Sequence, residues 1–126
     1  MLATLGIEIQ MKDRFDIIVV GGGPAGCAVA RAYGLSGKSV ALLEADPVGQ
    51  PKQRFAGEWL HPQGVEALQK LGFGEIAESV GRPRGRGFVV YPGHGESPVK
   101  LDYVDGQIGL AFHHGDLVEE MRRIVA

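Results

Sequence analysis

A glycine-rich segment between an apolar run and a stretch of small residues most constrains how this chain can fold. Phe15 to Val20 is a short apolar run, and Gly21 to Gly26 follows it directly. The run has the length and β-branched content of a strand that is buried on both faces of a parallel sheet. Pro24 to Leu35 predicts a helix with proline in its first turn. Ser39 to Glu44 predicts a second buried strand, so the segment predicts a right-handed βαβ unit.

The turn satisfies the G-x-G-x-x-G pattern in its full context, because it follows a strand, opens a helix and has an acidic residue at the end of the next strand. Gly21 permits the tight turn, Gly23 lets the backbone approach a pyrophosphate, and Gly26 lets the helix pack closely on the strand. The helix N-terminus faces the phosphates. Glu44 would accept hydrogen bonds from ribose hydroxyls and repel a 2′-phosphate. The pattern predicts a dinucleotide site; the alternative is a glycine turn without a ligand.

The residues around this turn narrow the choice of dinucleotide. Asp16 to Gly26 resembles the N-terminal signature of FAD-dependent oxidoreductases. The resemblance lies in the Gly-Gly-Gly-Pro-Ala-Gly form, which includes Pro24 and Ala25 and is commoner there than in NAD dehydrogenases. It therefore implies that FAD is the cofactor and that both residues belong to the binding turn. An NAD-dependent dehydrogenase stays as a more distant alternative.

Three later segments resemble flavoprotein monooxygenases of the aromatic-hydroxylase and squalene-epoxidase group. They are Gln53 to Gly64, Leu68 to Gly72, and Phe112 to Gly115. The resemblance implies that Arg54 lies along the FAD, where its guanidinium can donate to phosphate or flavin oxygens; the alternative is an exposed loop arginine. The squalene-epoxidase pattern continues with an arginine where this chain has Asp116. No cofactor role is assigned to Asp116, which we expect to act as the N-cap of the last helix.

The resemblance implies an α/β fold class: a Rossmann-type FAD-binding βαβ unit with a small β appendage, forming an incomplete domain. It implies a flavin-dependent monooxygenase that uses NAD(P)H and O₂ on a small organic or lipid-like substrate. Two later motifs of that group and its substrate domain do not occur in this chain, so we expect the N-terminal part of a larger enzyme, inactive alone. We identify no general acid or base. The alternatives are an FAD-linked reductase of the geranylgeranyl-reductase type and a non-catalytic cofactor-binding fragment.

The rest of the chain gives a coarser pattern. Residues 1–13 are expected to be an N-terminal tail, and residues 14–126 the FAD/NAD(P)-binding domain. Met11 reads as a second start, so residues 1–10 are expected to be a tail or the product of an upstream start codon. The segment 47–56 predicts an irregular loop. Further helices are predicted at 61–71, 74–80 and 116–125, and further strands at 86–91, 98–102 and 108–112. Apolar surface left bare by an incomplete domain would favour self-association.

Composition and charge exclude several classes of function. The net charge is −2 and no basic face is visible, which argues against nucleic-acid binding. Arg82, Arg84 and Arg86 alternate and predict a solvated strand or loop. No apolar run approaches the roughly 20 residues that span a bilayer, and no secretion signal is recognised.

The cysteine and histidines suggest no chemistry of their own. Cys27 is the single cysteine and fits a reducing compartment, so the cytoplasm is the expected location. A thiol at a helix N-terminus can be activated, but core packing is the favoured interpretation. His113 and His114 are adjacent and lack partners at zinc-binding spacing, so we expect them to be structural or close to the flavin.

Overall fold

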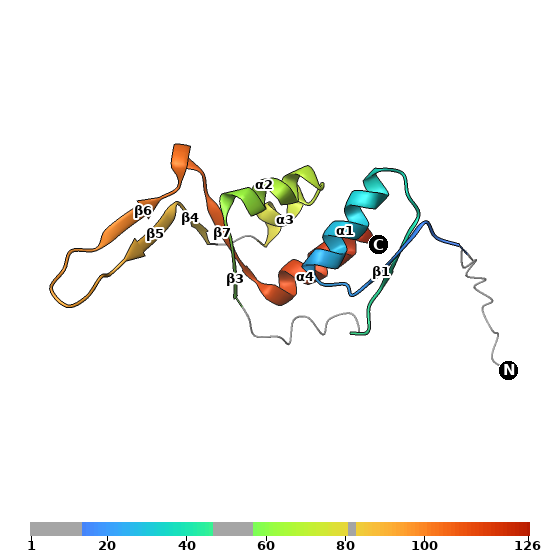
Figure 1. The fold of residues 1–126 in the computed structure, drawn as a ribbon, viewed down its shortest axis with the longest axis horizontal. Helices are drawn as coiled ribbons and strands as arrows, with labels where there is room; N and C mark the ends of the chain where they lie inside the picture. The colour runs from blue at the N-terminus through green and yellow to red at the C-terminus, as the bar shows by residue number, and fades with distance from the viewer. Residues whose placement is uncertain (1–13, 47–56, 81–82) are drawn as a thin grey trace.

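The computed structural model describes residues 14–46, 57–80 and 83–126. In chain order its elements are β1 (Ile17–Val20), α1 (Pro24–Leu35), β2 (Val40–Leu43), β3 (Gly57–Leu60), α2 (Pro62–Lys70), α3 (Gly74–Ser79), β4 (Arg84–Gly85), β5 (Gly87–Val90), β6 (Val99–Asp102), the 3₁₀ turn η2 (Val104–Gly106), β7 (Gly109–His113) and α4 (His114–Val125). The predicted α/β class is confirmed. Figure 1 shows an elongated arrangement, with β1 and α1 towards one end and the β5–β6 hairpin at the other. The predicted tail and the 47–56 loop lie outside the described residues.

The predicted βαβ unit is present. Strand β1 pairs in parallel with β2, in a register that runs from Ile17 opposite Val40 to Val20 opposite Leu43. Helix α1 connects the two strands and begins with proline at its first position, as the sequence predicted. Pro24 has no amide proton, but the first residue of a helix has no helical acceptor for one, so no hydrogen bond is lost. This unit places the glycine turn and the end of β2 side by side.

The predicted burial of these strands on both faces is wrong. Ile18 is 62%, Val20 83% and Leu43 54% exposed, and these side chains share one face of the β1–β2 pair. Helix α1 packs on the other face. No element among the described residues covers the first face, so the strands have the composition of an internal sheet while half of their surface is bare.

The core lies where the helices meet a second, antiparallel sheet of order β3-β7-β4. Strand β7 is central and contacts both α2 and α4. The sequence missed β3 and β4, because a four-residue and a two-residue strand carry too little pattern. The largest fully buried side chains come from α1, the α2–α3 junction, α3, β7 and α4; they are Phe73, Ile76, Leu110, Met121, Val118 and Cys27.

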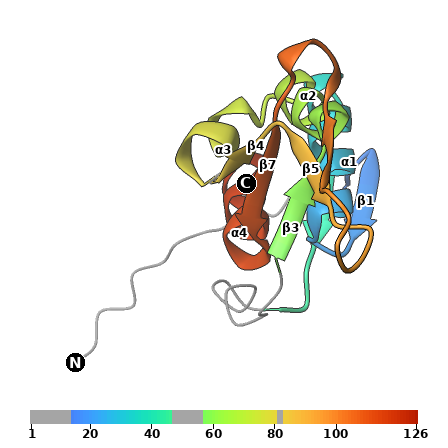
Figure 2. The ribbon, with the colours of Figure 1, turned by 90° about the vertical axis from the view of Figure 1, so that its left-hand side faces the viewer.

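The β5–β6 hairpin is the small appendage. All four residues of β6 are exposed, as are Phe88, Val89 and Val90 of β5. The hairpin projects from the body in Figure 1 and points towards the viewer in Figure 2. Phe88 of β5 contacts Trp59 of β3, with ring centroids 5.8 Å apart. Arg84 and Arg86 just before it are exposed, as predicted, whereas Arg82 lies outside the described residues.

Candidate functional site

The glycine turn joins β1 to α1 through backbone geometry that excludes larger residues. Gly21 has a φ of +101°, which side-chain-bearing residues rarely adopt, and its amide donates to the Leu43 carbonyl at 2.7 Å. A Cβ on Gly26 would collide with the carbonyl oxygen of Gly21. A Cβ on Gly23 would meet no described atom within 4 Å. The turn is therefore closed towards the protein at Gly26 and open outwards at Gly23.

The N-terminus of α1 presents donors at this open side. Gly23 is the N-cap and its carbonyl accepts the first helical hydrogen bond, from the Cys27 amide at 2.9 Å. Pro24 has no amide proton, while the amides of Ala25 and Gly26 belong to the first turn and have no intrahelical acceptor. Together with the helix dipole, these donors favour an anion.

The carboxylate of Glu44 lies beside the turn. Its Oε2 accepts from the Gly22 amide at 2.6 Å, and its Oε1 accepts from the Asp46 amide at 2.9 Å. The hydrogen bonds from Asp46 and Gly22 and the charge of Arg122 hold the pKa of Glu44 below its usual range. An ionised acceptor is thus fixed at the carboxyl end of β2, next to the helix N-terminus.

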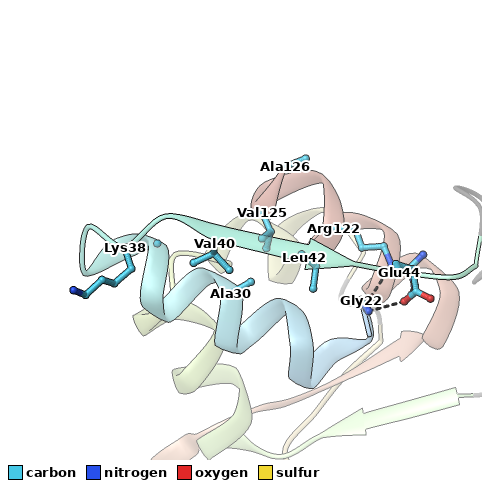
Figure 3. A pocket seen from close by; sticks show the side chains of 10 residues that line it. Gly22, Ala30, Lys38, Val40, Leu42, Glu44, Arg122, Val125 and Ala126 are labelled. Carbon is cyan, nitrogen blue, oxygen red and sulfur yellow. Dashed lines mark hydrogen bonds and ion pairs between the residues drawn. The ribbon is translucent and has the colours of Figure 1, made fainter. Parts of the chain in front are cut away.

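Arg122 reaches the same place from α4, near the end of the chain. Its Nε donates to the Gly22 carbonyl at 2.7 Å and its Nη2 to Glu44 Oε2 at 2.6 Å. Figure 3 shows the three residues together at one end of a hollow. Sequence reasoning missed both Gly22 and Arg122. A Cβ on Gly22 would lie 2.9 Å from Glu44 Oε2, so a side chain at Gly22 would displace that carboxylate.

No motif could have singled out Arg122, because Arg123 follows it on the same helix. Arg123 instead pairs with Glu120 at 2.9 Å and Glu75 at 3.7 Å, away from the turn. The packing of α4 against α1 decides which of the two arginines faces the glycine turn.

The other predicted residues have different outcomes. Arg54 lies outside the described residues. Cys27 is fully buried in the core, which confirms the packing interpretation, and burial raises the pKa of its thiol. Asp116 is not the N-cap: α4 begins two residues earlier, with His113 as N-cap, because the helix continues directly from β7.

Glu58 forms a side-chain pair that the sequence did not indicate. Its Oε1 lies 2.7 Å from Nδ1 of His114. His113 lies 4.0 Å from Asp116, so the adjacent histidines engage different acids. No cluster of His, Cys, Asp and Glu among residues 14–46, 57–80 and 83–126 could hold a metal ion.

The hollow in Figure 3 has a volume of about 500 Å³ and only partly overlaps the glycine turn. Gly22, Glu44 and Arg122 line one end, and the rest runs between α1 and β2 past Ala30 and Val40. Apart from Lys38 at the far end, that part is lined by apolar residues and glycine, whereas a diphosphate needs the amides at the N-terminus of α1. We therefore place the candidate anion site at the open side of the turn and not along the hollow. In the described part of the chain, no helix is long and apolar enough to cross a bilayer.

Comparisons with known proteins identify relatives of this chain. The family model described as FAD dependent oxidoreductase matches residues 16–82. Squalene epoxidase erg1 of Schizosaccharomyces pombe is 34% identical over 113 residues, covering 86% of this chain and 24% of that protein. Squalene monooxygenase of Mus musculus is 33% identical, covering 96% and 22%. The structure of Klebsiella pneumoniae HpxO with FAD and uric acid aligns with a TM-score of 0.64 and 26% identity, covering 87% and 28%. The chain spans about a quarter of the length of these curated relatives.

Proposed function

Since this chain belongs to the FAD-dependent oxidoreductases, we propose that it binds FAD and serves as the FAD-binding part of a flavin-dependent monooxygenase. The observation that carries the proposal is the pairing of an open glycine turn at the N-terminus of α1 with the ionised carboxylate of Glu44 at the end of β2. The same pairing of donors for a diphosphate with an acceptor for a ribose is what an adenine dinucleotide requires.

The residues present fit such a cofactor. Gly21 and Gly26 shape the turn, and Gly23 leaves open space for the cofactor. The amides of Ala25 and Gly26, which follow Pro24 in the first turn of α1, would donate to the diphosphate. Glu44 would accept from the ribose hydroxyls and disfavour a 2′-phosphate. We also propose that Arg54 contacts the cofactor, on the basis of the family resemblance. Bound FAD supplies the redox chemistry, and this part of the enzyme supplies binding and orientation.

The proposed reaction consumes O₂ and NAD(P)H, inserts one oxygen atom into a small organic or lipid-like substrate and releases the other as water. The support for a lipid-like substrate is the name of two relatives, squalene epoxidase and squalene monooxygenase. The buried single thiol of Cys27 supports a reducing compartment, and we propose the cytoplasm.

The visible spectrum of the purified protein tests the cofactor. We expect flavin absorbance and release of FAD on denaturation. Gly23→Val should abolish binding while the fold survives, because no described atom within 4 Å opposes the new side chain. Glu44→Ala should weaken it. Gly34→Ala serves as the control, since that position is equally open but lies at the other end of α1. Colourless protein that ignores FAD and binds NAD would contradict the proposal.

The bare face of the β1–β2 pair supports a further proposal, self-association. Ile18, Val20 and Leu43 present a contiguous apolar surface on this face, and such surfaces are usually covered. We expect a dimer by analytical ultracentrifugation that Val20→Lys returns to a monomer. A monomer at all concentrations would argue against it.

A further inference from the structure

We propose that Arg122 is a positioning residue for the ribose of the cofactor, holding the carboxylate of Glu44 and the backbone of Gly22 in one arrangement. The inference rests on the proposed binding of FAD and deepens it. It adds to the site a residue that stands 100 positions after Gly22 and belongs to none of the motifs read from the sequence.

Three hydrogen bonds close a ring between Arg122, Glu44 and Gly22. Arg122 donates twice, from Nε to the Gly22 carbonyl at 2.7 Å and from Nη2 to Glu44 Oε2 at 2.6 Å. The Gly22 amide completes the ring by donating to the same Oε2 at 2.6 Å. The peptide groups on both sides of Gly22 are thus anchored, and one side chain fixes the turn relative to the end of β2. Figure 3 shows the ring at one end of the hollow.

The chemistry of arginine suits this role better than a simple counter-charge would. The guanidinium is planar, so its two donors keep a fixed separation and hold two acceptors at once. A lysine carries one ammonium group on a flexible stem and cannot reproduce that fork. The side chains of Arg122 and Glu44 are 19% and 23% exposed, so the ion pair is partly shielded from water.

The lone pairs that remain free on the Glu44 carboxylate determine where a ribose hydroxyl can bind. Each carboxylate oxygen offers about two lone pairs, and Oε2 of Glu44 already accepts from Gly22 and Arg122. A ribose hydroxyl that approaches an intact ring is therefore directed to Oε1, which Asp46 holds in place through its amide. Without Arg122, Oε2 would keep only the hydrogen bond from the Gly22 amide, and its freed lone pair could also accept a ribose hydroxyl, so the preference for Oε1 would be lost.

A purely structural role, fastening α4 to α1, is the competing explanation, and a pair of ligands separates the two. ADP carries both ribose hydroxyls, whereas 2′,3′-dideoxy-ADP keeps the diphosphate and adenine and lacks them. If Arg122 acts through Glu44, replacing it weakens the binding of ADP more than the binding of the dideoxy compound. A variant that only loosens the fold weakens both ligands alike.

The experiment measures the affinities of FAD, ADP and 2′,3′-dideoxy-ADP by calorimetry for the wild type, Arg122→Gln, Arg122→Lys and the control Arg123→Gln. We expect Arg122→Gln to lower the affinity for FAD and for ADP by about tenfold, the effect of losing one hydrogen bond to a charged group. The dideoxy compound should change by less than about twofold, as should every ligand with Arg123→Gln. Arg122→Lys should resemble Arg122→Gln. In a Glu44→Gln background, Arg122→Gln should add little.

The outcomes are distinguishable. If the wild type binds FAD and ADP while Arg122→Gln binds both as well or better, Arg122 does not position the carboxylate, and the proposed function stands. Equal weakening of ADP and its dideoxy analogue also overturns the inference, because it assigns Arg122 to the fold alone. If the wild type binds neither FAD nor ADP, the proposed function fails and the inference fails with it.

Discussion

The βαβ end of the molecule and the β5–β6 hairpin are held in place by different kinds of contact. At the βαβ end, backbone groups and charged side chains fix the turn: the Gly21 amide bonds the end of β2, and Arg122 and Glu44 clamp Gly22. At the hairpin, aromatic rings make the contact, and the side-chain hydrogen bonds there run between rings. Phe88 packs edge-on against the rings of Trp59 and Tyr103, at centroid distances of 5.8 and 6.0 Å.

The difference concerns directionality. Hydrogen bonds to a peptide group allow one geometry, which suits a turn that must present its amides to a ligand. Ring packing tolerates small displacements, and the exposed hairpin has no other described sheet to pair with. We therefore expect the βαβ end to be the more rigid, with the core between the two ends carrying most of the stability.

Removing a ring from the core should have the largest effect. Phe73 is fully buried beside Ile76 and Met121, whereas Phe88 in the hairpin is 44% exposed. Phe73→Ala should lower the free energy of unfolding by about 3–5 kcal/mol. Phe88→Ala should cost only about 1 kcal/mol, since less apolar surface is lost. Urea denaturation of both variants measures the two values, and equal losses would show that the hairpin is part of the core.

The next effect concerns the turn itself. Gly26→Ala places a methyl group against the Gly21 carbonyl, and a backbone atom cannot move aside cheaply. We expect a loss of about 3 kcal/mol in unfolding free energy, together with loss of FAD binding. Gly34→Ala on the same helix meets no described atom within 4 Å and should stabilise by about 0.5–1 kcal/mol. A Gly26→Ala protein as stable as the wild type would mean that the turn is looser than the structure indicates.

A smaller effect is expected where the hairpin meets β3. The Tyr103 hydroxyl accepts from Trp59 Nε1 at 2.8 Å and lies 2.8 Å from His61 Nδ1. Tyr103→Phe removes both contacts and should cost about 1 kcal/mol. Trp59 is the single tryptophan, so a shift in its emission reports the loss of this hydrogen bond directly. Tyr91→Phe, at a ring that is 74% exposed, is the matched control and should leave the emission unchanged.

The smallest effect should come from pH. The pKa of Glu44 is lowered in the folded chain, so its ionised form contributes stability above the unfolded pKa of 4.5, and this is lost as pH falls through the lower folded value. Stability of the wild type should therefore fall below about pH 4.5 more steeply than that of Glu44→Gln. Thermal melts at successive pH values measure the two slopes. Parallel curves would mean that Glu44 is as free in the folded chain as in the unfolded one.

Residue patterns predicted the βαβ end well, because its constraints are local. The bounds of α1 were predicted without error, and the family resemblance is confirmed by the match over residues 16–82. The roles of Gly21, Gly23, Pro24, Ala25, Gly26, Glu44 and Arg54 in binding a cofactor stay predictions. Short strands were harder: β3 exists because it pairs with β7, where Trp59 lies opposite Ala111. Four residues alone do not reveal such a partner.

The sequence by itself determined the turn, since glycine adopts a φ of +101° at Gly21 without strain and leaves no Cβ to collide at Gly26, wherever the rest of the chain lies. It also determined that an acid, Glu44, follows the second strand. Only the tertiary structure decided which of two neighbouring arginines meets that acid. A helix positions its residues through packing against distant elements, and that packing turns Arg122 towards Gly22 while Arg123 faces Glu120 and Glu75. Local rules fix backbone geometry, whereas contacts across 100 residues depend on the fold as a whole.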